Sequence, residues 1–174
     1  FNMMFSMPDC IIVGIANVDR KRDFTFHTEL KDLKKDYPTT GHSEKFIRFI
    51  ESELQPYISK QYKTTDTRYL IGQSLGGLLA SEILLKHSTL FTHYLIVSPS
   101  LWWDNESLLK AAPELVAKQD LSGTFVYVSV GKGEDKIMQR EASQLYELLK
   151  KANKPGLQTA FKLMIDDNHA TILH

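Results

Sequence analysis

The chain has 174 residues, which is enough for one domain with a substantial hydrophobic core. Its 21 lysines and arginines balance its 21 aspartates and glutamates, so the charge favours neither nucleic acid nor an anionic membrane as a partner. No apolar stretch is long enough to predict a membrane span. The single cysteine, Cys10, cannot form an internal disulfide, and its apolar neighbours predict a buried thiol.

The first 60 residues predict one buried strand and one amphipathic helix. Residues Cys10–Ile15 are apolar and rich in β-branched side chains, as in a buried parallel strand. Residues 24–41 have no sustained periodicity. Ser43 then suits a helix N-cap, and apolar residues recur at helical spacing over 46–58. We expect this helix to lie against the sheet.

A charged loop, residues 17–23, follows the first predicted strand. Open α/β sheets bind ligands beyond the carboxyl ends of their strands. Arg20, Arg22 and Asp23 are therefore candidates to face a binding site. A solvated run of charges explains each of them equally well.

The stretch Thr67–Leu85 predicts a short strand, a tight turn and an apolar helix. The turn has the pattern G-x-S-x-G with Ser74 at its tip, which is typical of a nucleophile elbow. We expect side chains at Gly72 and Gly76 to collide where strand and helix approach each other. The helix begins with Leu75, whose amide would face a developing oxyanion. The alternative is an ordinary strand, turn and helix with a surface serine.

Further strands and helices alternate down to the C-terminus. This alternation predicts a single α/β domain over residues 1–174, with a mostly parallel sheet and helices on both faces. The predicted strands cover residues 94–97, 123–130 and 159–165, and the predicted helix between the last two covers residues 137–151.

Both tryptophans, Trp102 and Trp103, come directly after the strand at 94–97. Large aromatic surface beyond a strand end suits the wall of a substrate pocket, although we expect one of the two to be a core residue. Residues 106–118 predict two short helices divided at Pro113, and we expect them to form a cap over the site.

Three residue types in three turns predict a catalytic triad. Ser74, an acid and His169 each follow a predicted strand, in the chain order serine, acid, histidine. His169 would take the Ser74 proton, and the acid would orient the imidazole. Glu134 and Asp135 are both candidates for the acid, and we prefer Glu134. The other carboxylate would be exposed or would cap the following helix.

Five segments, spread in order over nearly the whole chain, resemble the putative-esterase family of α/β-hydrolases, and in particular its siderophore (enterochelin-type) esterases. They are IIVGIANVDRKRDFT, YLIGQSLGGLLASEILL, LIVSPSLWWDN, SVGKGED and DDNHATIL. The resemblance implies ester hydrolysis through an acyl-serine, without a metal or organic cofactor. It implies the roles of nucleophile for Ser74, base for His169 and acid for Glu134. It also implies that the pairs Arg22-Asp23 and Trp102-Trp103 lie near the substrate pocket.

The resemblance also implies a strand between Cys10–Ile15 and the elbow strand, and this strand would belong upstream of Phe1. The second oxyanion donor would come from the loop after it. We therefore expect the sequence to be the middle and C-terminal part of a longer protein. An upstream signal peptide would decide the compartment, which is otherwise expected to be cytoplasmic.

Three functions compete at this stage. The first is a serine esterase acting on a small-molecule ester, with a siderophore lactone as one candidate. The second is an acyltransferase that uses the same serine with an acceptor other than water. The third is a non-catalytic binding module with a hydrolase fold. The sequence leaves the natural ester and the oligomeric state open.

Overall fold

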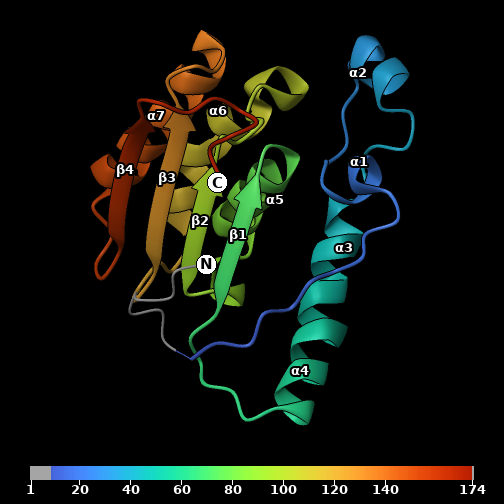
Figure 1. The fold of residues 1–174 in the computed structure, drawn as a ribbon, viewed down its shortest axis with the longest axis vertical. Coiled ribbons are helices and arrows are strands. Elements are labelled where there is room, and N and C mark those ends of the chain that lie inside the picture. The colour runs from blue at the N-terminus through green and yellow to red at the C-terminus, as the bar shows by residue number, and fades with distance from the viewer. Residues whose placement is uncertain (1–8, 174) are drawn as a thin grey trace.

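The computed structural model describes residues 9–173 and contains one parallel β-sheet. The sheet order is β1-β2-β3-β4, so neighbours in the sheet are also neighbours in the chain (Figure 1). In register, Tyr69 pairs with His93, His93 with Phe125, and Phe125 with Gln158. The strands are β1 (Tyr69–Gln73), β2 (His93–Val97), β3 (Phe125–Gly131) and β4 (Gln158–Met164).

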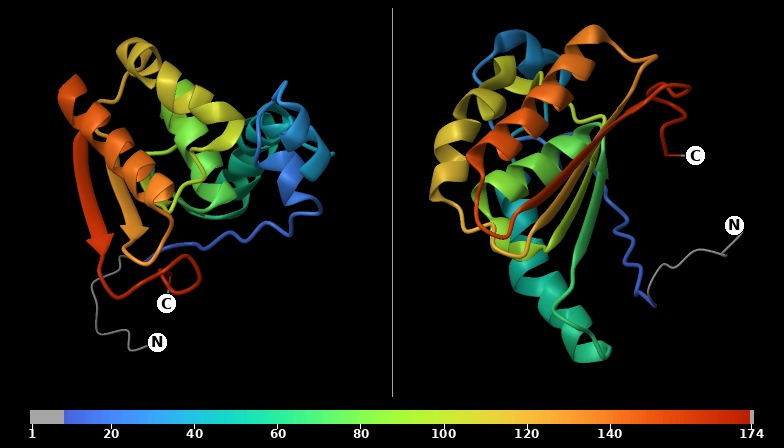
Figure 2. Two further views of the ribbon diagram at one scale, coloured as in Figure 1. Left: turned by 90° about the horizontal axis from the view of Figure 1, so that it is seen from above. Right: turned by 90° about the vertical axis from the view of Figure 1, so that its left-hand side faces the viewer.

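Helices α5, α6 and α7 lie on one face of the sheet, where α5 and α7 pack on the strands and α6 packs on α5 and α7 (Figure 2). We expected helices on both faces. Parallel strands are joined by right-handed crossovers, and the strand order never reverses, so each crossover places its helix on the same side. The helical elements are α1 (Arg20–Asp23), α2 (Lys31–Asp36), α3 (Ser43–Phe49), the π-helical η1 (Ile50–Leu54), α4 (Gln55–Gln61), α5 (Leu75–Lys86), the 3₁₀ turn η2 (Ser88–Leu90), α6 (Trp103–Lys118) and α7 (Lys136–Ala152).

The core lies between the sheet and these three helices. Alternate strand residues face it, as expected for a strand with one buried side; Tyr94 and Ile96 on β2 and Val126 and Val128 on β3 are fully buried. Helix α5 is buried around most of its circumference, which explains why its sequence is apolar almost throughout. The core therefore fixes the helix that begins directly after Ser74.

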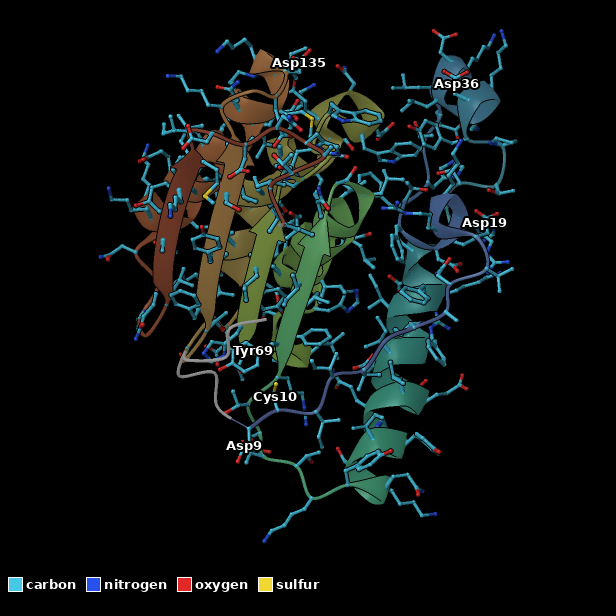
Figure 3. All side chains as sticks on the ribbon, viewed as in Figure 1. Asp9, Cys10, Asp19, Asp36, Tyr69 and Asp135 are labelled. Carbon is cyan, nitrogen blue, oxygen red and sulfur yellow. The ribbon has the colours of Figure 1, made fainter. Side chains whose placement is uncertain are left out.

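The opposite face of the sheet is partly open in the part of the chain that the structure describes. Strand β1 pairs only with β2 there, and its Tyr69 and Ile71 side chains are exposed, Ile71 by 61%. Cys10–Ile15 does not form the predicted strand. It is an extended coil without sheet hydrogen bonds, Ile12 is 86% exposed, and Cys10 on this coil is exposed rather than buried (Figure 3). A strand needs a hydrogen-bonded neighbour, and this segment has none among residues 9–173.

Two helical predictions need adjustment and two hold. The predicted helix over 46–58 is present as the continuous run α3, η1 and α4 (Figure 1). Helix α7 is also present, and Asn153 ends it in a left-handed conformation. Helix α6 continues through Pro113 and is not split there. Its irregular backbone lies instead near its start, at Asp104, Asn105 and Glu106, which all have positive φ.

Helix α6 does not cap the site. It packs against α5 and α7 through a buried face that includes Leu108, Leu109, Ala112 and Val116. This burial outweighs the helix-breaking tendency of an internal proline. Among residues 9–173, no helix combines the length and apolar character needed to cross a membrane.

Candidate active site

Ser74 lies at the tip of a sharp turn between β1 and α5. Its backbone has φ 60° and ψ −119°, a conformation that costs a non-glycine residue on the order of 1–3 kcal/mol. The turn needs glycine on the strand side, since a Cβ at Gly72 would lie 2.1 Å from the Gly76 carbonyl oxygen. It also needs Gly77, where a Cβ would lie 2.9 Å from the Pro99 Cα.

The expected collision at Gly76 is wrong, because a Cβ added there meets no atom within 4 Å. The close contact is made by the carbonyl group of Gly76, which any residue would carry. The two positions that require glycine are therefore Gly72, two residues before the serine, and Gly77, three residues after it. The first glycine of the G-x-S-x-G pattern is needed for packing, and the second is not.

Glu134 and His169 meet at the same edge of the sheet. Glu134 lies in the turn after β3 and His169 in the loop after β4, and the Nδ1 of His169 donates to Glu134 Oε2 at 2.7 Å. The Glu134 side chain is fully buried, whereas the His169 side chain is 45% exposed. The sequence predicted this pair of side chains, and the structure places them in direct contact.

Backbone contacts hold the two loops together. Gly133 N donates to Asp167 O at 2.9 Å, and Lys132 N donates to Met164 O at 2.8 Å. A Cβ at Gly131 would lie 2.6 Å from Asp167 O, so a larger residue there would push the loops apart. The glycines of the G-x-G-E turn therefore make room for the loop that carries His169.

Asp135 occupies a different position from Glu134. Its side chain accepts from Ile137 N at 2.8 Å and so caps the N-terminus of α7 (Figure 3). Because its carboxylate bonds to the helix backbone, it does not contact His169. The structure thus places the preferred acid on the histidine and the other acid on the helix, one of the two places expected for it.

Ser74 and His169 do not share a hydrogen bond in this structure. The Ser74 hydroxyl lies 3.4 Å from Ser100 Oγ, while the His169 imidazole contacts Glu134. The loop of His169 is nonetheless tied to the elbow, because the side-chain amide of Gln73 donates to the His169 carbonyl oxygen at 2.7 Å. Catalytic hydrogen bonds often close only when substrate is present.

A cavity of about 200 Å³ opens beside Ser74. Its wall includes Leu75. Because Leu75 is the first residue of α5, its amide has no acceptor within the helix. Trp102 also lines the cavity, whereas Trp103 is fully buried and donates from Nε1 to Phe26 O at 3.0 Å. One tryptophan is therefore a wall and the other a core residue, as the sequence suggested. The complete lining is Arg20, Lys21, Tyr37, Ser74, Leu75, Ser100 and Trp102.

Arg22 and Asp23 do not line this cavity. They pair with each other at 2.8 Å, and the hydrogen bond and charge of Asp23 raise the pKa of Arg22. Both face a second cavity of about 470 Å³, whose other lining residues are His42, Lys45, Phe46 and Phe49. The three charged candidates lie on the short helix α1 rather than in the predicted loop, and only Arg20 among them contacts the cavity beside Ser74.

Sequence reasoning missed several residues of the site. Lys21 lies in the charged loop that supplied the other candidates, and Ser100 follows β2 together with Ser98, so their positions carried a signal. Tyr37 lies in the segment without periodicity, and no pattern marked it. Within residues 9–173, no group of three or more histidine, cysteine, aspartate or glutamate side chains is arranged to hold a metal ion.

A serine elbow on a parallel sheet, with an acid and a histidine beyond the next strand ends, defines the α/β-hydrolase class of proteins. The family model described as "Putative esterase" matches residues 5–170, so the chain belongs to this esterase family.

Named relatives agree with this assignment. The chain is 30% identical to the ferri-bacillibactin esterase BesA of Bacillus subtilis, over 94% of this chain and 63% of that protein. Among solved structures, the BES protein from Bacillus cereus has 34% identity and a TM-score of 0.78, over 88% of this chain and 58% of that one. An IroE-like serine hydrolase from Shewanella oneidensis has 28% identity and a TM-score of 0.80, over 91% and 54%. The chain therefore spans between half and two thirds of the length of these relatives.

Proposed function

We propose that the protein is a serine esterase that cleaves a carboxylic ester through an acyl-serine intermediate. Ser74 Oγ attacks the ester carbonyl while His169 Nε2 accepts its proton, and the alcohol leaves with that proton. Water, activated by the same imidazole, then releases the acid and restores Ser74. Glu134 accepts the hydrogen bond from Nδ1–H of His169 and stabilises the imidazolium that forms.

The observation that carries this proposal is the contact between His169 and Glu134 at the sheet edge where Ser74 lies. A buried carboxylate bonded to Nδ1 fixes the tautomer that leaves Nε2 free to act as a base. A histidine with a merely structural role would not need this tautomer beside a strained serine. The strain at Ser74 supports the same proposal, since strained residues cluster at active sites.

The Leu75 amide is the proposed donor to the oxyanion. It points from the first turn of α5, where the helix dipole also favours negative charge. Removing such a donor typically costs on the order of 10²-fold or more in kcat.

The proposed substrate class is an anionic ester, and a siderophore lactone is the particular candidate. The curated relative named for ferri-bacillibactin supports this choice by similarity. The cavity beside Ser74 supports it chemically, because Arg20 and Lys21 bring positive charge and Trp102 brings aromatic surface to the same wall. Arg22 is withdrawn from this role, since it pairs with Asp23 on the second cavity.

The test is hydrolysis of p-nitrophenyl acetate and butyrate together with labelling by a serine-directed phosphonate. We expect turnover and labelling in the wild type and neither in Ser74→Ala. Ser107→Ala, which removes a hydroxyl outside the site, is the matched control and should label normally. A folded wild type that neither turns over nor labels would overturn the proposal and favour a non-catalytic binding module. Faster release of the acyl group to added alcohols than to water would favour an acyltransferase.

A further inference from the structure

Ser98 is a buried serine that the reaction scheme does not use. It follows the last residue of β2, and its side chain is fully buried. Its hydroxyl donates to Oε1 of Glu134. The same oxygen accepts from Gly131 N at 2.8 Å, while the other carboxylate oxygen, Oε2, bonds to His169.

These contacts divide the carboxylate of Glu134 between two tasks. Oε1 is held by two donors that belong to the neighbouring strands, and Oε2 is left for the imidazole. Hydrogen bonds to an ionised group are roughly twice as strong as neutral ones, so the two donors hold Oε1 of Glu134 firmly in place. They also prevent rotation about the last side-chain bond, which would turn Oε2 away from His169.

The backbone at Ser98 makes this contact possible. Ser98 has φ 43°, in the left-handed region that side chains other than glycine rarely adopt. Its amide still donates to Ser129 O at 2.8 Å, so the ladder between β2 and β3 continues while the chain turns. The strained conformation aims the hydroxyl along the sheet edge at Glu134. A glycine would relieve the strain, so the serine is retained at an energetic cost.

We propose that Ser98 is a positioning residue of the esterase: its hydroxyl, with the Gly131 amide, clamps one oxygen of Glu134 so that the other orients His169 toward Ser74. This inference rests on the proposed serine esterase function. Ser98 does not line the cavity beside Ser74, and its hydroxyl bonds to Glu134 rather than to the nucleophile. Its removal therefore acts on the acid and the base rather than on substrate binding.

The experiment compares Ser98→Ala and Ser98→Gly with the wild type. Both substitutions remove the hydroxyl, and glycine also relieves the positive φ, so loss of folding cannot explain an effect common to both. We expect kcat to fall about 10-fold with KM unchanged, the size of effect that loss of one hydrogen bond to a buried charge produces. Ser88→Ala is the matched control. Ser88 is also a buried serine, in the turn η2 that precedes β2, and its hydroxyl donates to Asp120 O at 2.8 Å.

A second readout does not depend on turnover. The Nδ1 proton of His169 lies between imidazole and carboxylate, and such a proton has a resolved low-field resonance in the ¹H NMR spectrum. We expect this resonance in the wild type and in Ser88→Ala, and its loss or a marked shift in both Ser98 variants. Wild-type kcat and an unchanged resonance in folded Ser98→Gly would overturn the inference. If the wild type shows the resonance, the Ser98 variants lose it, and no protein has esterase activity, the result would count against the proposed function alone.

Discussion

Gln73 and His169, which are 96 residues apart in the chain, are joined by a hydrogen bond of 2.7 Å from the Gln73 side-chain amide to the His169 carbonyl oxygen. The residue before the nucleophile thereby holds the backbone of the residue proposed as the base. The strand that presents Ser74 and the loop that presents His169 are thus linked by this contact, even though the two functional side chains do not touch in this structure.

Gln73→Met should weaken catalysis without weakening binding. Methionine has a similar length but no amide, so the His169 loop loses one anchor worth about 1 kcal/mol. We expect kcat to fall roughly 5-fold at constant KM. Steady-state kinetics with a p-nitrophenyl ester measures both. Gln144→Met changes an exposed glutamine of α7 in the same way and should have no effect. A rise in KM as large as the fall in kcat would show that Gln73 acts on the substrate instead.

The two glycines of the G-x-S-x-G pattern should respond differently to alanine. Gly72→Ala places a Cβ 2.1 Å from a carbonyl oxygen and should cost roughly 3 kcal/mol or more. Gly76→Ala lies in α5 with free space around it and should stabilise the fold by up to about 1 kcal/mol. Urea denaturation of both variants checks this. Equal losses of stability at the two positions would contradict the packing argument.

Separate substitutions of the two neighbouring acids, Glu134 and Asp135, should distinguish catalysis from helix capping. Glu134→Gln leaves the shape of the side chain but removes the charge that stabilises the imidazolium, and we expect kcat to fall on the order of 10³-fold or more. Asp135→Ala should retain kcat and lose about 1 kcal/mol of stability, because it removes the cap of α7. Kinetics and thermal unfolding measured together decide the matter. The reverse pattern would make Asp135 the acid.

Glu141 should make stability fall with rising pH. Burial, and next the charge of Glu106, raise its pKa from 4.5 to about 7, while Arg140 acts in the opposite direction. A carboxyl whose pKa is higher in the folded state than in the unfolded chain supports folding fully below pH 4.5, and this support is lost as the pH rises through 7. We expect urea denaturation to show less stability at pH 8 than at pH 5.

Glu141→Gln provides the control for this pH effect. The neutral amide cannot ionise, so the variant should lose less stability than the wild type between pH 5 and pH 8. Subtracting the pH-dependent change of the variant from that of the wild type cancels the contribution of the other titrating groups. An identical pH dependence in both proteins would mean that Glu141 keeps its ordinary pKa. The same pair of measurements on Glu106→Gln would show how much the charge of Glu106 adds to the effect of burial on the pKa of Glu141.

Local sequence patterns predicted the core of the fold well. The strands β1 to β4 and the helices α5 and α7 have clear periodicity and turn residues at their ends, and each appears close to its expected limits. The turns of Ser74, Glu134 and His169 follow from those strands, since parallel strands bring their carboxyl ends to one edge. The order of the elements therefore predicted an acid from the turn after β3 beside His169, while it left Glu134 and Asp135 both open.

The errors arose where a residue's partner lies far away in the chain. An apolar run such as Cys10–Ile15 has the composition of a strand, but pairing requires a neighbour, which composition does not report. Helices on both faces were expected from alternation alone, whereas the side that each helix takes depends on strand order. Pro113 was taken as a break, and burial of the surrounding helix overrode that local tendency. Ser98 could not be found, because its role depends on a contact 36 residues away.

The open edge of β1 bears on how the protein would behave at high concentration. Within residues 9–173, β1 pairs only with β2, and an unpaired strand edge with exposed Tyr69 and Ile71 beside it is a template for another extended chain. Strand β1 has no proline or inward-pointing charge to block such pairing. Self-association would then begin at the strand that leads directly into Ser74. Strand β1, Tyr69–Gln73, therefore affects both the tendency to self-associate and the geometry of the turn that carries Ser74.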